Sequence, residues 1–283
     1  MGKVIAVTNQ KGGVGKTTTT INLAASLALA ERKILVLDFD PQGNATSALG
    51  VSSQQIDPEK TVYHALVGHI PLEETLQKTE VDGLLLAPAT QDLAGAEVEL
   101  VSAFSRETKL KTAIAALKNK FDYIFIDCPP SLGLLTINAL TAADSFLIPL
   151  QTEYFALEGL GQLLHTVELI KQSLNMSLEQ EGIVLTMADS RNKLSREVEK
   201  EVREHFNAKV FDAVIPRNVR LSECSSFGKP IVLYDVHSKG CSAYLSLARE
   251  FLRNNQAGKM PEPPLFVKKD EMNEVTSFSS PNG

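Results

Sequence analysis

The sequence predicts an α/β fold, with a single domain built on a mostly parallel, twisted sheet that carries helices on both faces. Short apolar runs rich in Val, Ile and Leu recur at residues 4–8, 34–38, 84–87, 123–127, 146–150 and 182–186. Each run is too continuous to leave one face of a strand in water, which is typical of a strand buried on both sides. Because most of the runs alternate with segments of helical periodicity, we expect the strands to pair in parallel beneath covering helices.

The helical segments carry apolar residues three or four positions apart. Leu23, Leu27 and Ala30 follow the first predicted strand, and a later stretch contains Leu160, Leu163, Leu164 and Val167. This spacing gives each helix one apolar face that can cover the sheet. No repeat or internal linker interrupts the alternation before about residue 255. One domain over residues 1–254 is therefore the simpler organisation.

Residues 255–283 differ in composition from the rest of the chain. They contain Pro261, Pro263 and Pro264, scattered charges and no sustained apolar period. This composition predicts a flexible or loosely docked C-terminal tail. The short apolar stretch at residues 264–267 is compatible with docking on a partner or on the domain itself, although a disordered end is the commoner outcome.

The overall composition is that of an ordinary globular protein. A length of 283 residues and 43% hydrophobic content allow a large core, and a net charge of −6 argues against coating nucleic acid through overall charge, while leaving room for a local basic face. The three cysteines lie far apart without a CxxC pair, which predicts reduced thiols rather than disulfides or a metal site. We find no signal peptide and no apolar stretch near ~18 residues, so we expect a cytoplasmic protein that does not bind membranes.

The strongest motif is the loop Gln10-Lys11-Gly12-Gly13-Val14-Gly15-Lys16-Thr17-Thr18, which lies between the first strand and the first helix. Glycines let the backbone N–H groups curl towards phosphates, and the helix presents its positive N-terminus to the same anion. Lys16 is expected to reach the β- and γ-phosphates, and the Thr17 hydroxyl to bind Mg²⁺. The strict GxxxxGK[ST] pattern fails at Gln10, and the loop carries an extra lysine, Lys11. The alternative is a glycine turn with unrelated lysines, which the flanking strand and helix disfavour.

Two acidic segments follow predicted strands at the same edge of the sheet. Asp38 and Asp40 come at the end of the 34–38 strand, and Asp127 ends the 123–127 strand. Open α/β folds bind their ligands at this edge, and a carboxylate there is the expected direct or indirect ligand of Mg²⁺. Alone, each segment is a weak signal, because Asp-Pro also starts ordinary turns. Together with the loop, they favour a metal and water site.

Four segments resemble one family. The loop KGGVGKTT, the segments DFDPQGN and IDCPPSLG, and IPRNVRLSE at 215–223 are similar to the ParA/Soj partitioning ATPases, which belong to the deviant Walker A group of P-loop NTPases. The resemblance extends over residues 1–252, and the absence of an N-terminal helix-turn-helix extension is similar to the short, Soj-like subtype. The chain departs from the family pattern at Cys224-Ser225, where Ala-Pro is expected, which puts only the local turn in doubt.

The resemblance implies a set of roles for these residues. It implies an ATP sandwich homodimer in which Lys11 crosses to the other subunit's nucleotide, so that Lys11, Lys16 and Asp40 are catalytic. Asp40 would orient the attacking water, Asp127 would hold Mg²⁺ through water, and the metal site would comprise Thr17, Asp40 and Asp127. The nucleotide would contact residues of the loop and of the segment near the adenine: Lys11, Gly12, Gly13, Val14, Gly15, Lys16, Thr17, Thr18, Pro216, Arg217 and Asn218.

A DNA-binding face is also expected. Residues 192–206 predict an amphipathic helix with Leu194, Val198, Val202 and Phe206 on its inner side, and with Arg196, Lys200 and Arg203 in a basic stripe opposite. Glu197, Glu201 and Glu204 flank that stripe, so a solvated helix laced with ion pairs is the stronger interpretation of this helix alone. The family resemblance points instead to Arg191 and Arg220 as residues that bind DNA, with Lys229 and Lys239 as weaker candidates.

The expected function is a DNA-segregation ATPase. The resemblance implies that it dimerises on ATP, binds double-stranded DNA non-specifically at the nucleoid, and hydrolyses ATP when a centromere-binding ParB/Spo0J-like partner stimulates it. The alternative is a MinD-like membrane-associated cell-division regulator, but the proline-containing tail lacks a basic amphipathic face. Iron–sulfur carriers with the same loop need a cysteine pair, and a metabolic kinase needs an acceptor-binding segment. Neither is apparent in the sequence.

Overall fold

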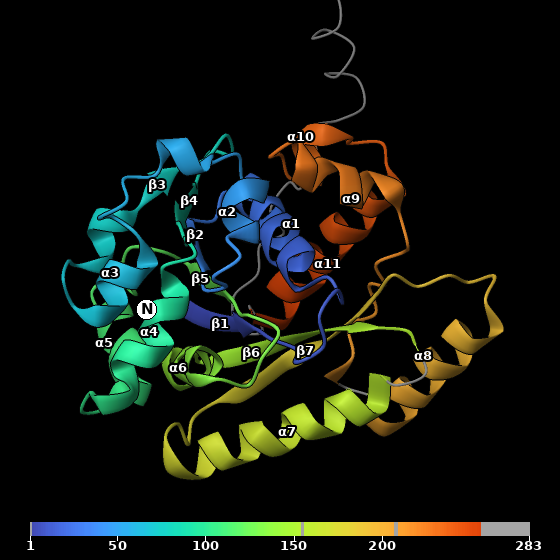
Figure 1. Cartoon of the computed structure of the whole chain (residues 1–283). Helices are drawn as coiled ribbons and strands as arrows, with labels where there is room; N and C mark the ends of the chain where they lie inside the picture. Colours follow the sequence, from blue (N-terminus) through green and yellow to red (C-terminus); the bar gives the residue numbers. More distant parts are fainter. Residues whose placement is uncertain (1, 154–155, 207–208, 256–283) are drawn as a thin grey trace, which may run out of the picture.

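The computed structural model describes residues 2–153, 156–206 and 209–255. Its centre is a seven-stranded sheet with the order β3-β4-β2-β5-β1-β6-β7. The strands are β1 (Lys3–Val7), β2 (Ile34–Asp38), β3 (Gln77–Lys78), β4 (Leu84–Ala87), β5 (Tyr123–Asp127), β6 (Ser145–Gln151) and β7 (Glu179–Thr186). All pairs are parallel except β3 with β4 at one edge. The predicted mostly parallel sheet is therefore confirmed (Figure 1).

The predicted strands all appear, with shifts only at their ends. β1 begins and ends one residue earlier than expected, whereas β6 and β7 extend beyond the apolar runs that revealed them. Only β3 was missed. It contains two residues, Gln77 and Lys78, of which one is exposed, so it lacks the continuous apolar run that identifies a buried strand.

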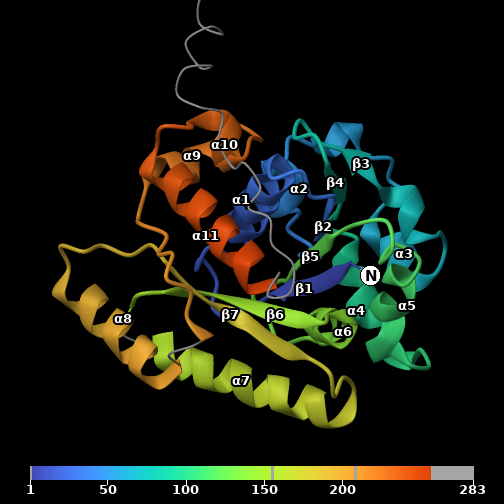
Figure 2. The same ribbon diagram turned by 180° about the vertical axis from the view of Figure 1, so that it is seen from behind.

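Helices cover both faces of the sheet. They are α1 (Lys16–Leu29), α2 (Asn44–Ala48), α3 (Val62–Val67), α4 (Leu93–Glu99), α5 (Lys109–Ile114), α6 (Leu134–Ala142), α7 (Ala156–Ser173), α8 (Lys193–Phe206), α9 (Val219–Ser226), α10 (Ile231–Tyr234) and α11 (Lys239–Asn255). Short 3₁₀ segments connect several of them. The opposite views of Figures 1 and 2 show α1, α9, α10 and α11 on one side of the sheet, and α6 and α7 on the other.

Each face of the sheet has its own hydrophobic core. Strand β1 contributes side chains to both cores. Val4 and Ala6 pack into the core that includes α6 and α7, whereas Ile5 and Val7 pack into the core that includes α1 and α11. All four side chains are fully buried. The continuous apolar composition of the strand follows from this two-sided burial.

One side-chain placement on α8 was wrong. Leu194 was expected on the inner side, but it is 40% exposed, while its neighbour Ser195 is buried together with Val198 and Val202. Ser195 hydrogen-bonds through its hydroxyl to Thr152 at 2.6 Å. The helix thus contacts the domain along a narrow stripe, and one residue of helical rotation, about 100°, carries Leu194 out of it. Phe206 is half-buried against the core as expected.

Helix α11 is the last element of the described residues. This helix continues through Asn255, one residue past the expected boundary, and the Asn255 side chain accepts a hydrogen bond from Lys3 Nζ at 2.7 Å and donates one to Glu181 Oε1 at 2.6 Å. The predicted tail after this point lies outside the described residues. Cys128, Cys224 and Cys241 are buried free thiols. Within the described ranges, no helix combines the length and apolarity needed to cross a membrane.

Candidate nucleotide-binding site

The glycine loop joins β1 to α1 at the carboxyl edge of the sheet. Gly13 (φ 74°) and Gly15 (φ 88°) adopt left-handed conformations that other residues rarely tolerate. Gly15 occupies the N-cap of α1 without a side-chain hydrogen bond to the cap, so no side chain at that position competes for the N–H groups of the first turn. The loop therefore has the backbone of an anion site, with unsatisfied helical amides at its end.

Lys16 lies inside the loop. The residue is only 7% exposed, and its ammonium group donates to the Lys11 carbonyl at 3.1 Å. Burial lowers the pKa of Lys16, while the neighbouring charges of Asp127 and Asp40 act in the opposite direction. A cation held in this position is placed to meet an anion that enters the loop.

Asp127 ties the end of β5 to the first turns of α1. Its carboxylate accepts hydrogen bonds from the Thr17 hydroxyl at 2.7 Å and from the Thr20 hydroxyl at 2.9 Å. The predicted metal ligands Thr17 and Asp127 are therefore in direct contact. Thr20 was not predicted, although its position one turn after Lys16 would bring it to the same face of the helix.

Asp38 stands beside Asp127 in the parallel register of β2 and β5. Both carboxyl groups are fully buried, and this burial raises the pKa of Asp127 to about 7 and that of Asp38 to about 6. Asp38 is held by Thr46, whose backbone N–H and hydroxyl both donate to Oδ2 at 2.7 Å. Burial thus disfavours the ionised form of both carboxyl groups, and a bound cation would stabilise that form.

The donor set fits Mg²⁺. The Thr17 hydroxyl and the Asp127 carboxylate supply hard oxygen ligands at one point, and Mg²⁺ prefers such ligands while it retains several waters. Asp40 lies on the loop after β2, is 7% exposed, and accepts a hydrogen bond from the Gln42 N–H at 2.9 Å. Asp40 is close enough for its charge to act on Lys16. The structure thus brings Thr17, Asp40 and Asp127 around Lys16.

A cavity of about 250 Å³ opens beside the loop. It is lined by Gly15, Thr18, Thr186, Met187, Ile215, Pro216, Arg217, Asn218, Val219, Leu221, Ser222 and Tyr244. The predicted adenine segment, Pro216 to Asn218, is therefore adjacent to the start of α1. Hydrogen bonds between the backbones of Ala188 and residues 215 and 217 hold this segment against the end of β7.

Thr186, Met187 and Tyr244 line this cavity but lie outside the motifs that the sequence revealed. Thr186 ends β7 and donates its hydroxyl to the Val14 carbonyl at 2.8 Å, which anchors the glycine loop. Its position at the carboxyl end of a predicted strand was a usable signal. Met187 has a positive φ of 50°, and Tyr244 reaches the cavity from α11. Neither of these two carries a local sequence signal.

Lys11 behaves differently from Lys16. Its side chain is 42% exposed, and its ammonium group forms an ion pair with Glu153 Oε2 at 2.6 Å. Glu153 lies just after β6 and also accepts a hydrogen bond from Gln151. This partner was not predicted, because the two residues are separated by the whole length between β1 and β6.

The predicted DNA-binding arginines are both exposed and both paired with acids. Arg191 donates to both carboxylate oxygens of Asp189, from Nε at 3.0 Å and from Nη2 at 2.9 Å. Arg220 lies on the first turn of α9 and donates to Glu223 at 2.9 Å. The weaker candidate Lys229 pairs with Glu80 at 3.2 Å.

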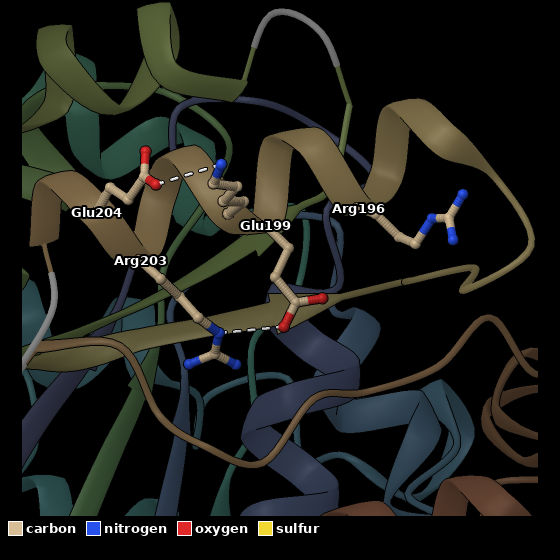
Figure 3. A pocket seen from close by; sticks show the side chains of 5 residues that line it. Arg196, Glu199, Arg203 and Glu204 are labelled. Carbon is tan, nitrogen blue, oxygen red and sulfur yellow. Dashed lines mark hydrogen bonds and ion pairs between the residues drawn. The ribbon is translucent and has the colours of Figure 1, made fainter.

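The outer face of α8 is a mixture of basic and acidic residues, as its glutamates indicated. Arg203 pairs with Glu199 at 3.1 Å and also donates to the Phe211 carbonyl, while Lys200 pairs with Glu204 at 3.6 Å. Figure 3 shows Arg196 pointing away from these pairs. The ion-paired interpretation of Lys200 and Arg203 is therefore confirmed.

The comparisons with known proteins agree with this geometry. A family model described as an AAA domain matches residues 2–180. The chain is 58% identical over 255 residues to the chromosome partitioning protein ParA of Myxococcus xanthus, covering 90% of this chain and 89% of that protein. It is 56% identical over 254 residues to the sporulation initiation inhibitor protein Soj of Bacillus subtilis, covering 90% and 100% respectively.

A solved structure also carries the nucleotide and metal that the loop implies. The cobyrinic acid a,c-diamide synthase of Mycobacterium smegmatis, with bound ADP and magnesium, superposes with a TM-score of 0.79 at 39% identity, over 92% of this chain and 97% of that chain. Sequence identity, fold and site geometry all indicate the same family. The chain therefore belongs to the ParA/Soj family of partitioning ATPases, and it hydrolyses ATP with Mg²⁺ as cofactor.

Proposed function

We propose that this ATPase is a DNA-segregation switch of the nucleoid. In this proposal, ATP drives formation of a homodimer, the dimer binds double-stranded DNA non-specifically, and a centromere-binding ParB/Spo0J-like partner stimulates hydrolysis. The main support for the proposal is the different placement of the two loop lysines. Lys16 is buried inside the loop, whereas Lys11 projects outward to Glu153.

Within one subunit, the loop residues would hold the nucleotide. The N–H groups of residues 12–18 and the Lys16 ammonium group would bind the phosphates, and the cavity lined by Pro216, Arg217 and Asn218 would receive the adenine. Thr17 would bind Mg²⁺ directly, and Asp127 would hold it through water. Asp40 would also belong to this metal site. When bound, Mg²⁺ supplies positive charge to the phosphate oxygens.

Two further groups would complete hydrolysis. Asp40 is placed near Lys16 without contacting its ammonium group in any described hydrogen bond, so it is free to orient a water molecule towards the γ-phosphate. Lys11 would deliver its charge to the nucleotide of the other subunit, as an arginine finger does. Hydrolysis would then depend on dimerisation, which is the property a switch requires.

DNA binding would use the exposed arginines. A monomer with a net charge of −6 offers only a small basic face to a polyanion, so a single copy of Arg191 and Arg220 gives weak binding. Two copies on one rigid dimer raise avidity without any new contact. The bound nucleotide would thus control DNA binding by setting whether one basic face (monomer) or two (dimer) contact the DNA.

Paired lysine variants test the proposal. We expect Lys16→Ala to abolish nucleotide binding, because the loop loses its internal cation, and Lys11→Ala to retain nucleotide affinity while losing the ATP-dependent dimer. Equilibrium binding of a fluorescent ATP analogue and analytical ultracentrifugation with ATP measure the two effects. A Lys11→Ala protein that dimerises normally would exclude the role across the interface. Sedimentation with anionic vesicles in ATP would support the MinD-like alternative instead.

A further inference from the structure

Arg220 lies between two carboxylates. Its Nη1 group is 2.9 Å from Glu223 Oε2, and its Nε group is 3.4 Å from Asp235 Oδ2. Glu223 lies one turn further along α9, and Asp235 directly follows α10. Helices α9 and α10 lie together at the upper right of Figure 1. One positive charge is therefore paired with two negative charges at this point of the surface.

The acids are themselves held in place. The Tyr234 hydroxyl donates to Glu223 Oε2 at 3.2 Å, and the Tyr234 ring stacks on Phe227 at a centroid distance of 5.3 Å. The backbone N–H of His237 donates to Asp235 Oδ1 at 3.2 Å. We call Glu223, Tyr234 and Asp235 the Arg220 cage. Because α9, α10 and the following turn all contribute, the cage is more than a chance contact between two long side chains.

We infer that the Arg220 cage sets the strength of DNA binding by competing with phosphate for the guanidinium group. This inference rests on the proposed function, in which Arg220 contacts DNA. A phosphate that approaches Arg220 meets a local charge of −1, and it must displace Glu223 and Asp235 before it can form a charge-assisted bidentate contact. Each carboxylate that leaves the guanidinium loses an interaction that was present in the free protein.

Arg191 provides a comparison within the same molecule. It has one carboxylate partner, Asp189, and its side chain is 89% exposed, whereas the Arg220 side chain is 54% exposed. Of the two arginines, Arg220 is therefore the one that has two acids to displace, whereas Arg191 has one. Competition from two carboxylates would keep the DNA affinity of each subunit low, so that binding depends on both subunits acting together.

The sharpest test keeps the formal charge constant. Tyr234→Phe removes the hydroxyl that holds Glu223 but leaves every charge in place. With ATP present, we expect this variant to bind duplex DNA more tightly than the wild type. Glu223→Gln should have a larger effect of roughly two- to fivefold, which is the range that an exposed ion pair contributes. Glu73→Gln is the matched control, because it removes an acid from another exposed ion pair, with Lys120.

A mutant cycle with Arg220→Ala separates competition from general electrostatics. If the cage acts through Arg220, Glu223→Gln should gain no more than Glu73→Gln when Arg220 is absent. An equal gain with and without Arg220, or no gain from either cage variant, would overturn the inference. Wild-type protein that binds no DNA with ATP, or Arg220→Ala that binds normally, would instead overturn the proposed role of Arg220. ATP binding is measured for each variant to show that it is folded.

Discussion

Individual side chains at the carboxyl edge of the sheet differ in what they already contact. Thr17, Thr20 and Asp127 form a hydrogen-bonded group. Among the described residues, the Asp40 carboxylate accepts a hydrogen bond only from the Gln42 N–H. Asp38, two residues earlier, is fully buried and committed to Thr46. Of the two aspartates after β2, Asp40 is therefore the better candidate to orient a water molecule.

We expect Asp40→Ala to bind ATP and to dimerise, but to hydrolyse ATP at a rate reduced by about 10²-fold or more, the range of a positioned acid–base group. The reason is that Asp40 would act on water rather than on the nucleotide. Single-turnover hydrolysis, with size-exclusion chromatography in ATP, measures both properties. Asn44→Ala, at the start of α2 directly after this loop, is a control that removes a polar side chain but no carboxylate. Normal turnover by Asp40→Ala would move the catalytic role to another residue.

At the scale of elements, the apolar runs of the sequence predicted the strands that are buried on both faces. They did not predict β3, which is not buried in this way. The run Tyr123–Asp127 is fully buried, and its apolar composition made it visible. β3 pairs only at the sheet edge through two residues, so its formation depends on β4 rather than on its own composition. Helix α8 was found nearly to the residue, but its rotation was not, because the contact of Ser195 with Thr152 depends on tertiary packing.

The rotation of α8 about its axis decides which of its side chains stabilise the fold. Val202 is fully buried and Leu194 is 40% exposed. We therefore expect Val202→Ala to lower the free energy of unfolding by about 1.6 kcal/mol or more, since it removes two buried carbon groups of about 0.8 kcal/mol each. Leu194→Ala should change it by less than about 0.5 kcal/mol.

Urea denaturation measures the free energy of unfolding of both α8 variants. Because each variant introduces an alanine into the same helix, the helix propensity of the new residue is the same in both. Equal losses for the two variants would show that Leu194 packs against the domain, as the periodicity alone suggested. A loss at Val202 alone would support the observed rotation.

For the whole molecule, the candidate site is a consequence of parallel topology. The ends of β1, β2, β5 and β7 meet at one edge, and this edge collects the glycine loop, Asp40, Asp127 and Thr186 from distant parts of the chain. The sequence could predict residues that directly follow a recognisable strand. It could not predict Glu153 as the partner of Lys11, or Tyr244 in the cavity, because these contacts arise only when α11 and the β6 end pack against the loop.

In the proposed switch, ATP controls DNA binding by joining two weak basic faces in one dimer. If each subunit makes ~3 to 4 phosphate contacts, a dimer makes ~6 to 8, and the logarithm of the binding constant should fall with the logarithm of salt concentration by ~0.9 per contact. The most direct measurement is a salt titration of duplex DNA binding with ATP, with ADP and without nucleotide, using Arg220→Glu as the variant that weakens the face. We predict tight binding with a steep salt slope only in ATP, and a uniform loss of affinity across DNA sequences in Arg220→Glu. Equal affinity and equal slopes in all three nucleotide states would show that ATP does not control DNA binding.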